Sequence, residues 1–382
     1  MPSQEPIVIP GLDIPKAKRY SRVRLGLLGA SLAWSVGSMA WLARQQRAKR
    51  LQQRIAEVMP DERLVAPAFL ASVGAGSWLA GLPLAYVSGL AVERAFGLTK
   101  QSTPDWFAEQ VKGLAVGTAL QTPLMTAAFI VIRRRPHDWW LILAGATVPL
   151  MVVLSNLAPV LLMPLFNTFA PLSDDRLRDQ LLALTERSGV KVADIYEMDM
   201  SRQSEKPNAM FTGIGNTKRI VLGDTLLRDF TPDEIAGVVA HELGHQVHGD
   251  IWRLIAMGGA MGFGGAWLLS RLAPQVVTAT SDETGVTVIG DEAAYPLLAI
   301  LGTGLGFLAA PLSSAVSRWM ERRADRYAIA LTRDPEGYAQ AMERLAATAL
   351  ADPDPPRPVV IMLYSHPPIA ERIRAARATS VS

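Results

Sequence analysis

The 382-residue chain contains no cysteine. This excludes disulfide bonds, thiolate zinc sites and a cysteine nucleophile. Charge is also scarce: Asp, Glu, Lys and Arg make up 19% of the residues, against about 25% in a soluble domain. Hydrophobic residues make up 49%, and the net charge is only +3. The composition favours a membrane protein, and the lack of a basic patch interleaved with aromatics argues against nucleic-acid binding.

Long uncharged runs predict the membrane spans. Leu25–Ala43 follows a basic segment, residues 1–24, and its 19 residues are enough to cross a bilayer. A cleaved signal peptide is the competing interpretation, but the run exceeds a typical signal-peptide core and no convincing cleavage site precedes Arg44. We therefore expect a retained first span. Four further runs are long enough to span: Leu64–Val92, Gly113–Ile132, Trp139–Asn167 and Ala293–Ser317.

A sixth run, Leu254–Ser270, is marginal because it has only 17 residues and many glycines. The alternative is a buried helix or a re-entrant segment. Gly258, Gly262 and Gly265 would permit close packing against another helix. We count this run as a span, which gives six spans in total. The sequence thus predicts a mainly α-helical, multi-pass membrane protein.

A polar segment, residues 173–250, precedes the sixth run. The spacing of its leucines predicts a helix over Asp174–Ser188. In Thr231-Pro232-Asp233-Glu234, threonine suits the N-cap, proline the first helical position, and Glu234 completes a capping box, so a second helix should begin there. Strands and one turn are predicted at the following positions: Asp194–Met200, Ala209–Gly213 and Lys218–Leu222, with the turn at Gly213–Asn216.

The charges of the loops bear on orientation. If both chain ends are cytoplasmic, the segment 173–250 is cytoplasmic too, and the acidic loop 271–292 is outside, as the positive-inside rule prefers. The basic loops Arg44–Arg63 and Arg133–Arg135 would then also lie outside. The opposite orientation would place the basic N-terminal segment and Arg318–Arg326 outside. We prefer the first orientation.

The helix that should begin at Thr231 carries His241-Glu242-Leu243-Gly244-His245. Residues four apart on a helix share a face and lie about 6 Å apart along its axis, so His241 and His245 can bind one metal ion. Glu242 then lies beside that ion, where it can act as a general base toward water. The competing interpretation is an ordinary polar helix face. A glutamate directly after the first histidine is typical of zinc peptidases.

A catalytic zinc ion usually has three protein ligands. His248 shares the face of His241 but lies about 7 Å further along the helix axis than the expected metal ion, too far to bind it. The metzincin pattern does not fit either, because it requires a glycine where this chain has His248. We expect it to be a supporting or interfacial residue. Glu321 is the better third ligand: Asp325 follows it by four residues, so one carboxylate could bind metal while the other orients a ligand histidine. Without further context, these two carboxylates would more simply belong to an exposed helix face, where they pair with arginines.

Together these motifs resemble a known family. HELGH followed by Ser317-Arg318-x-x-Glu321-x-x-Ala324-Asp325 is similar to the type I CAAX prenyl protease family of integral-membrane gluzincin metalloproteases, to which bacterial heat-shock membrane proteases are related. The first five of the segments below are absent from the shorter heat-shock relatives, whereas Gly249-Asp250 looks more like that branch. The similar segments are Glu93–Leu98, Gln101-Ser102, Trp106 with Lys112-Gly113, Ala158-Pro159, Pro164–Leu172, Asn208–Gly213, Arg219–Leu227, Ser365–Pro368 and Glu371–Ile373.

The resemblance implies a complete catalytic site. One zinc ion per chain would be held by His241, His245 and Glu321, with Glu242 as general base and Asp325 behind a ligand histidine. The implied fold is a ring of about six transmembrane helices around a chamber, together with a gluzincin-type protease domain that contains a small β-sheet. His366 would stabilise the oxyanion, Arg372 would support the site, and the substrate backbone would pair with a strand made of Asn208, Ala209, Met210 and Phe211.

The predicted function is a zinc endopeptidase of the CAAX prenyl protease type, which acts on a prenylated or membrane-embedded peptide or protein. The alternatives are a quality-control protease of the heat-shock type in a bacterial inner membrane, a transporter, and a catalytically silent scaffold. Transporter spans usually carry ionisable groups, which these runs lack, and a silent relative would have lost Glu242 or a ligand. We divide the chain into a basic segment (1–24), spans one to four (25–172), a protease segment with the HELGH helix (173–253), spans five and six (254–317) and the C-terminal part of the protease domain (318–382).

Overall fold

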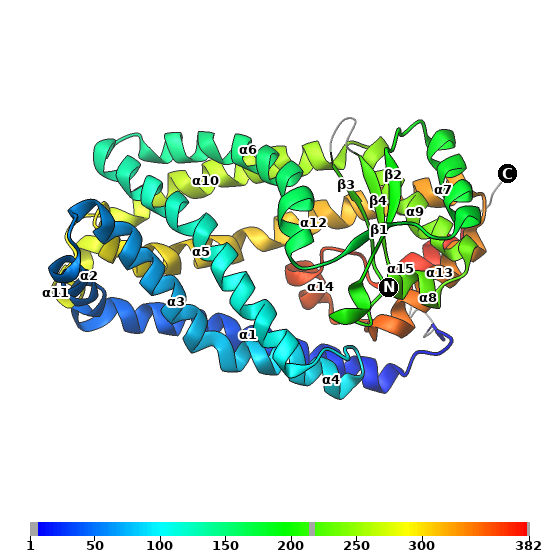
Figure 1. The fold of residues 1–382 in the computed structure, drawn as a ribbon, viewed down its shortest axis with the longest axis horizontal. Helices are drawn as coiled ribbons and strands as arrows, with labels where there is room; N and C mark the ends of the chain where they lie inside the picture. Colours follow the sequence, from blue (N-terminus) through cyan, green and yellow to red (C-terminus); the bar gives the residue numbers. More distant parts are fainter. Residues whose placement is uncertain (1–6, 214–217, 380–382) are drawn as a thin grey trace.

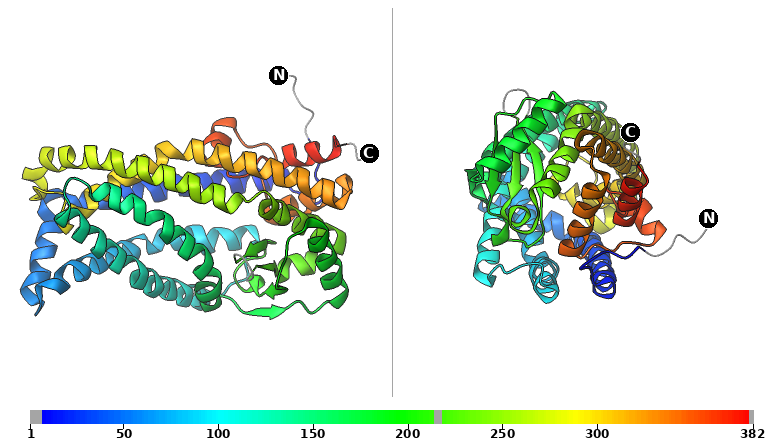
Figure 2. Two further views of the ribbon diagram at one scale, coloured as in Figure 1. Left: turned by 90° about the horizontal axis from the view of Figure 1, so that it is seen from above. Right: turned by 90° about the vertical axis from the view of Figure 1, so that its right-hand side faces the viewer.

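The computed structural model describes residues 7–213 and 218–379. Long helices run between the two ends of an elongated molecule, and a small sheet with shorter helices lies at one end (Figures 1 and 2). The elements of the first half are α1 (Ile14–Ala43), α2 (Arg47–Val58), α3 (Val65–Tyr86), α4 (Val92–Phe96), α5 (Thr103–Arg134), α6 (Trp139–Leu157), β1 (Phe169–Pro171) and α7 (Asp175–Ser188). Those of the second half are β2 (Asp194–Met198), β3 (Ala209–Thr212), β4 (Arg219–Gly223), α8 (Asp224–Asp229), α9 (Pro232–Val247), α10 (Asp250–Ala279), α11 (Ser281–Thr284), α12 (Tyr295–Thr332), α13 (Pro335–Ala349), α14 (Arg357–Leu363) and α15 (Ile369–Arg377).

Five helical stretches of the described chain are long and apolar enough to cross a membrane: Ile14–Val58, Glu62–Phe96, Thr103–Arg134, Trp139–Leu165 and Glu292–Thr332. They contain four of the six predicted spans in full, and a fifth, Trp139–Asn167, except for its last two residues. The sixth, Leu254–Ser270, is helical within α10 but is not among these five stretches. A sixth crossing, and the ring of helices around a chamber, therefore remain predictions.

The glycines of α10 allow it to approach α6 closely. A Cβ atom added at Gly259 would lie 2.9 Å from Val148, and one at Gly258 would lie 2.6 Å from the end of Met151. Gly262 faces Thr147 at an ordinary contact distance, whereas nothing lies within 4 Å of such an atom at Gly265. The prediction of close helix packing is correct for Gly258 and wrong for Gly265.

The sheet has the strand order β1-β2-β4-β3. β2 and β4 run parallel, with Asp194 opposite Arg219, while β1 and β3 lie antiparallel to their neighbours at the two edges. The three predicted strands are present. β1 was not predicted, because three residues are too few to show the alternation of apolar and polar side chains that indicates a strand. Residues 214–216 of the predicted turn lie outside the described part of the chain.

The predicted capping box at the start of α9 is present. The Thr231 hydroxyl accepts a hydrogen bond from the Glu234 N–H at 3.3 Å, and the Glu234 carboxylate accepts one from the Thr231 N–H at 2.8 Å. α9 then packs between the sheet and α7, α12 and α13. The core around it includes five fully buried side chains: Leu181, Ile195, Ile220, Leu243 and Tyr338.

α12 is one continuous helix that joins a candidate span to the protease part (Figure 1). The predicted boundary between residues 317 and 318 falls inside it, so no linker separates the two parts there. Since Ser317 and Glu321 belong to the same rigid helix, the packing of the span also determines where Glu321 lies.

A buried carboxylate connects the membrane helices to the sheet end. Glu93 in α4 accepts a hydrogen bond from the Tyr20 hydroxyl of α1 at 2.6 Å and pairs with Lys206 at 2.9 Å. Lys206 lies in the loop before β3, and the Glu205 N–H in that loop donates to the Leu98 carbonyl at 2.9 Å. The segment around Glu93 therefore holds the loop that leads into β3.

Candidate metal centre

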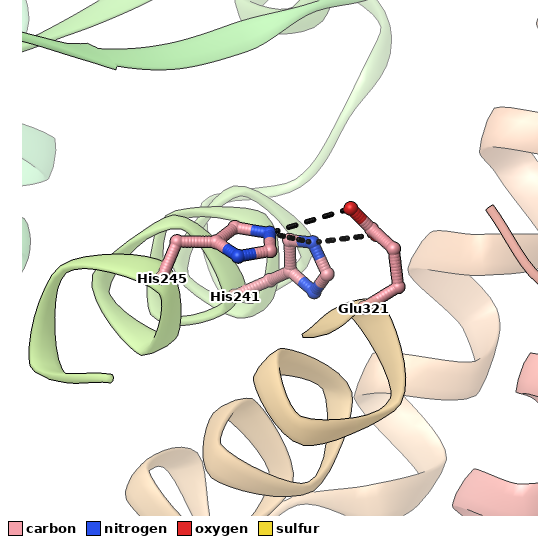
Figure 3. A group of neighbouring side chains, drawn as sticks. All are labelled: His241, His245 and Glu321. Carbon is pink, nitrogen blue, oxygen red and sulfur yellow. Dashed lines mark hydrogen bonds and ion pairs between the residues drawn. The ribbon is translucent and has the colours of Figure 1, made fainter. Parts of the chain in front are cut away.

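The centre lies where α9 crosses α12, and Gly244 makes the crossing possible. A Cβ atom added at Gly244 would lie 3.0 Å from the Cα and 3.2 Å from the carbonyl oxygen of Ala324 in α12. Glu321 lies one turn before Ala324. The close approach therefore brings its carboxylate to the two histidines of α9, and the three side chains point toward one another (Figure 3).

We expect Gly244→Ala to weaken metal binding although residue 244 touches no ligand. The new methyl group meets backbone, which cannot rotate away, so α12 must move by a few tenths of an ångström and carry Glu321 with it. Overpacking of this kind destabilises a protein by about 1–3 kcal/mol. Zinc affinity by chelator competition and the melting temperature should both fall. Gly265→Ala is the control, because its methyl group meets nothing within 4 Å; equal losses in both variants would contradict the argument.

The donor atoms of the centre have the spacing of a tetrahedral metal site. His241 Nε2 lies 3.2 Å from His245 Nε2 and 3.3 Å from Glu321 Oε2, and His245 Nε2 lies 3.5 Å from Glu321 Oε1. Zinc bonds of about 2.0–2.2 Å at tetrahedral angles place two ligand atoms about 3.4 Å apart. Glu321 Oε2 is buried and accepts no hydrogen bond from the described residues. These residues fit a zinc ion.

The charge around the histidines also favours a cation. Burial disfavours a charged imidazole, but the carboxylates of Asp325 and Glu321 raise the pKa of His241 to about 9. The pKa of His245 is likewise raised by Glu321 and Asp250, against the effect of burial. Positive charge is thus stabilised at the point where both Nε2 atoms meet.

Asp325 orients His241. Its Oδ1 lies 2.9 Å from His241 Nδ1, so that the Nδ1–H is directed at the carboxylate and the Nε2 lone pair faces the centre. Arg372 holds Asp325 through two hydrogen bonds of 2.6 and 3.0 Å, and the Tyr338 hydroxyl donates a third at 2.6 Å. The pKa of Arg372 is raised by Tyr338 and Asp325 although burial lowers it. The structure thus places Asp325 and Arg372 behind His241, and their roles remain predictions. Tyr338 was not among the predicted site residues.

Asp250 orients His245 in the same way, a role that was not predicted for it from the sequence. Its Oδ2 lies 2.9 Å from His245 Nδ1, and its Oδ1 is 3.2 Å from Arg253 and 3.8 Å from Arg323. Gly249, at φ +65°, turns the chain between α9 and α10 and brings Asp250 back toward His245. Each histidine is therefore backed by a carboxylate that is itself paired with arginine. In the sequence, the pair Gly249-Asp250 was the feature that could have indicated this role of Asp250.

We expect Asp250→Asn to reduce zinc affinity by about 10- to 100-fold, the usual effect of removing a carboxylate behind a ligand histidine. The amide still accepts a hydrogen bond, but it no longer makes the imidazole more basic. Competition with a zinc chelator measures the affinity. Asp282→Asn, an exposed substitution far from the centre, should leave the affinity unchanged. An unchanged affinity in Asp250→Asn would show that the contact is only structural.

Glu242 lies beside the centre and is not committed to another group. No hydrogen bond or ion pair of its carboxylate is found among the described residues, and burial raises its pKa. A carboxylate whose pKa is raised is a stronger base toward a proton of water. His248, in contrast, packs edge-on against Tyr327 at 5.7 Å, and its buried Nδ1 has no described partner. His248 is not part of the cluster, as predicted.

The described structure places His366 at the rim of the centre. Its Nε2 lies 3.3 Å from Glu321 Oε1, and its side chain is 58% exposed. The segment before it is held by Arg318, which donates to the carbonyls of Val360 and Tyr364 at 2.7 Å each. Arg318 thus ties the end of α14 to α12, one turn from Glu321, and this fixes the approach of His366. Its role toward an oxyanion stays a prediction.

β3 lies at the edge of the sheet beside α9. It contains Ala209, Met210 and Phe211, and it pairs with β4 on one side, where Ala209 faces Leu222 and Phe211 faces Ile220. Asn208 precedes the strand, and its carbonyl accepts a hydrogen bond from the Gly223 N–H at 2.9 Å. Its other edge has no strand partner among the described residues, so a substrate strand could be added there.

Comparisons with known proteins agree with this geometry. A family model described as "Peptidase family M48" matches residues 171–380, which include all the candidate site residues. The chain belongs to peptidase family M48. A second model, "CAAX prenyl protease N-terminal, five membrane helices", matches residues 10–168. The protein is thus a multi-pass membrane metalloprotease.

Relatives resemble the chain over most of its length. The metalloprotease YhfN of Bacillus subtilis is 31% identical over 366 residues, which cover 95% of this chain and 85% of that protein. CAAX prenyl protease 1 of Saccharomyces cerevisiae is 30% identical over 80% of this chain and 71% of its own. The crystal structure of Ste24p from S. mikatae is similar with a TM-score of 0.87, over 98% of this chain and 92% of that one, at 24% identity. The last comparison shows a shared fold.

Proposed function

We propose that this M48 metalloprotease is a zinc endopeptidase that cleaves near the C-terminus of prenylated peptides. The observation that carries the proposal is the centre itself: two imidazoles and a carboxylate at tetrahedral spacing, with Glu242 free beside them. Two histidines and a glutamate are the donor set of many zinc peptidases. Zinc bound there would polarise a peptide carbonyl and make water more acidic.

The residues of the chain then have separate tasks. Glu242 takes a proton from the attacking water and returns it to the leaving amine. His366, at the rim, donates a hydrogen bond to the developing oxyanion. Asp325 and Asp250 keep the Nδ1 atoms of the two histidines protonated, so that both Nε2 lone pairs stay directed at the centre. The edge of β3 holds the substrate in an extended conformation.

The choice of substrate rests on two observations. The similarity to CAAX prenyl protease 1 covers 80% of the chain, membrane helices included, and α12 joins a candidate span directly to Glu321. A peptide with a lipid anchor would enter from the bilayer, and its backbone could reach β3 while the lipid stays among the helices. We propose that a chamber between these helices would hold the lipid. Gly249-Asp250 resembles the heat-shock branch, but the described structure does not favour quality-control proteolysis or a silent scaffold over this function.

We also propose that the centre faces the cytoplasm. The described chain ends and the metal centre lie at the same end of the molecule (Figure 1), which the five candidate spans together with α10 would explain. The loop 280–292, with four acidic residues and no Lys or Arg, lies at the opposite end. The basic loops 44–63 and 133–135 lie at that end too, and this orientation places them outside against the positive-inside rule. Loops without basic residues are the ones that most readily cross to the outside. In a bacterium this corresponds to an inner-membrane enzyme.

The test is cleavage of a farnesylated CAAX peptide by the purified full-length protein, compared with the same peptide without the farnesyl group. We expect cleavage of the farnesylated peptide only, loss of cleavage with a zinc chelator, and recovery on adding zinc. Equal cleavage of both peptides would refute prenyl selectivity but leave the endopeptidase in place. Cleavage that continues after the metal has been removed, as verified by metal analysis, would refute the metallopeptidase mechanism.

A further inference from the structure

A cavity of about 690 Å³ lies at the end of the molecule opposite the metal centre. It is lined by residues of α2, of the turn before α3 and the first turn of α3, of the last turns of α5, and of the turn before α12. Its walls are of two kinds. Val65, Ala66 and Ile130 are apolar, whereas Arg63, Arg134 and Glu62 are charged.

Three arginines line this cavity, and two of them, Arg63 and Arg134, have no described side-chain partner. The loops 44–63 and 133–135 contain nine Lys and Arg residues. Six of them have side-chain partners: Arg44 with Glu283, Arg47 with Gln45, Lys49 with Asp291, Arg50 with the Gln45 carbonyl, Arg133 with Glu292 and Arg135 with Asp138. Within residues 7–213 and 218–379, the side chains of Arg54, Arg63 and Arg134 have none. Arg63 and Arg134 line the cavity, and Arg54 does not.

The cavity also lies at a defined level of the predicted membrane. Arg63 comes directly before the uncharged run Leu64–Val92, and Arg134 follows the run Gly113–Ile132 by two residues. The charged wall is therefore at the depth of lipid headgroups, and the apolar wall begins at the depth of the acyl chains. A ligand that fills both parts must be amphiphilic.

From this placement we propose that the cavity binds the phosphodiester headgroup of a membrane phospholipid, with Arg63 and Arg134 as phosphate ligands. Arg133 and Glu292 neutralise each other, which leaves two positive charges and the single negative charge of Glu62 facing the cavity. One phosphodiester, with a charge of −1, would balance the remaining +1. Arginine suits this task because its planar guanidinium donates two parallel hydrogen bonds to phosphate. Thr126, about two helical turns deeper than Arg134, also lines the cavity and adds a buried hydroxyl without a described partner.

Native mass spectrometry of the delipidated full-length protein tests the proposal, with phosphatidylglycerol as the probe. We expect Arg63→Gln combined with Arg134→Gln to weaken lipid binding about tenfold or more. Arg54→Gln is the matched control: it removes an unpaired arginine from the same end but outside the cavity, and it should bind as the wild type does. Glu62→Gln should bind more tightly, because it removes the one repulsive charge.

Three outcomes would overturn the proposal. They are wild-type affinity in the double variant, equal affinity for uncharged diacylglycerol, and inorganic phosphate that binds as tightly as the lipid, which would indicate a site for free phosphate. Zinc content and melting temperature are measured without lipid to show that each variant is folded. If the double variant does not fold, Glu62→Gln decides: unchanged or weaker lipid binding in that variant refutes the proposal.

Discussion

Glu242→Gln should keep its zinc and lose its peptidase activity. The substitution leaves the three donor side chains and both supporting carboxylates in place, because the Glu242 carboxylate makes no described contact with them. An amide cannot accept the proton of the attacking water, so the general-base contribution, about 10²- to 10⁴-fold, is lost. Turnover of a cleavable peptide is measured together with zinc content per chain.

Two controls make this result specific. Glu57→Gln, an exposed change on α2 at the opposite end, should have wild-type turnover. A chelator-treated wild type should lose turnover and zinc together, whereas Glu242→Gln loses turnover alone. Near-normal turnover in a zinc-loaded Glu242→Gln would mean that another group accepts the proton.

The chemistry of the centre could be predicted from the sequence because most of it is local. Helix geometry alone places residues that are four apart on one face, as it does for His241 and His245 and for Glu321 and Asp325. The start of α9 could also be predicted from the sequence, because Thr231 and Glu234 form their capping box within one turn. Features of this kind depend only on residues close together in the chain.

The parts that were missed depend on turns and helix packing that the local sequence pattern does not specify. Tyr338 reaches Asp325 only because α13 packs against α9, and nothing near Tyr338 in the sequence indicates this. Asp250 comes five residues after His245, a spacing that would point away on a continuous helix, and only the turn at Gly249 reverses it. The position of Glu321 beside the two histidines follows from the α9–α12 crossing, which Gly244 permits. Glu321 could be predicted as a ligand only through the family resemblance, because the spacing of Glu321 and Asp325 alone favoured an ordinary surface face.

The second large effect concerns the metal itself: Glu321→Ala and His241→Ala should each lose bound zinc. Two remaining ligands cannot close a site that requires three, and in Glu321→Ala the imidazoles face each other at 3.2 Å without the carboxylate between them. Zinc per purified chain should fall from about one to near zero after dialysis, and peptidase activity should fall with it. The two variants thus differ from Glu242→Gln, which keeps the ion.

Glu371→Gln separates this effect from a general loss of acidic charge. Glu371 pairs with Arg322, the residue next to Glu321, but its carboxylate is 44% exposed and belongs to no donor set. Because an exposed ion pair contributes about 0–1 kcal/mol, this variant should keep a full zinc complement and its melting temperature. A full complement in Glu321→Ala as well would show that the third ligand is another group. His366, whose Nε2 lies 3.3 Å from Glu321, would then be the first candidate, to be tested by His366→Ala in the Glu321→Ala background.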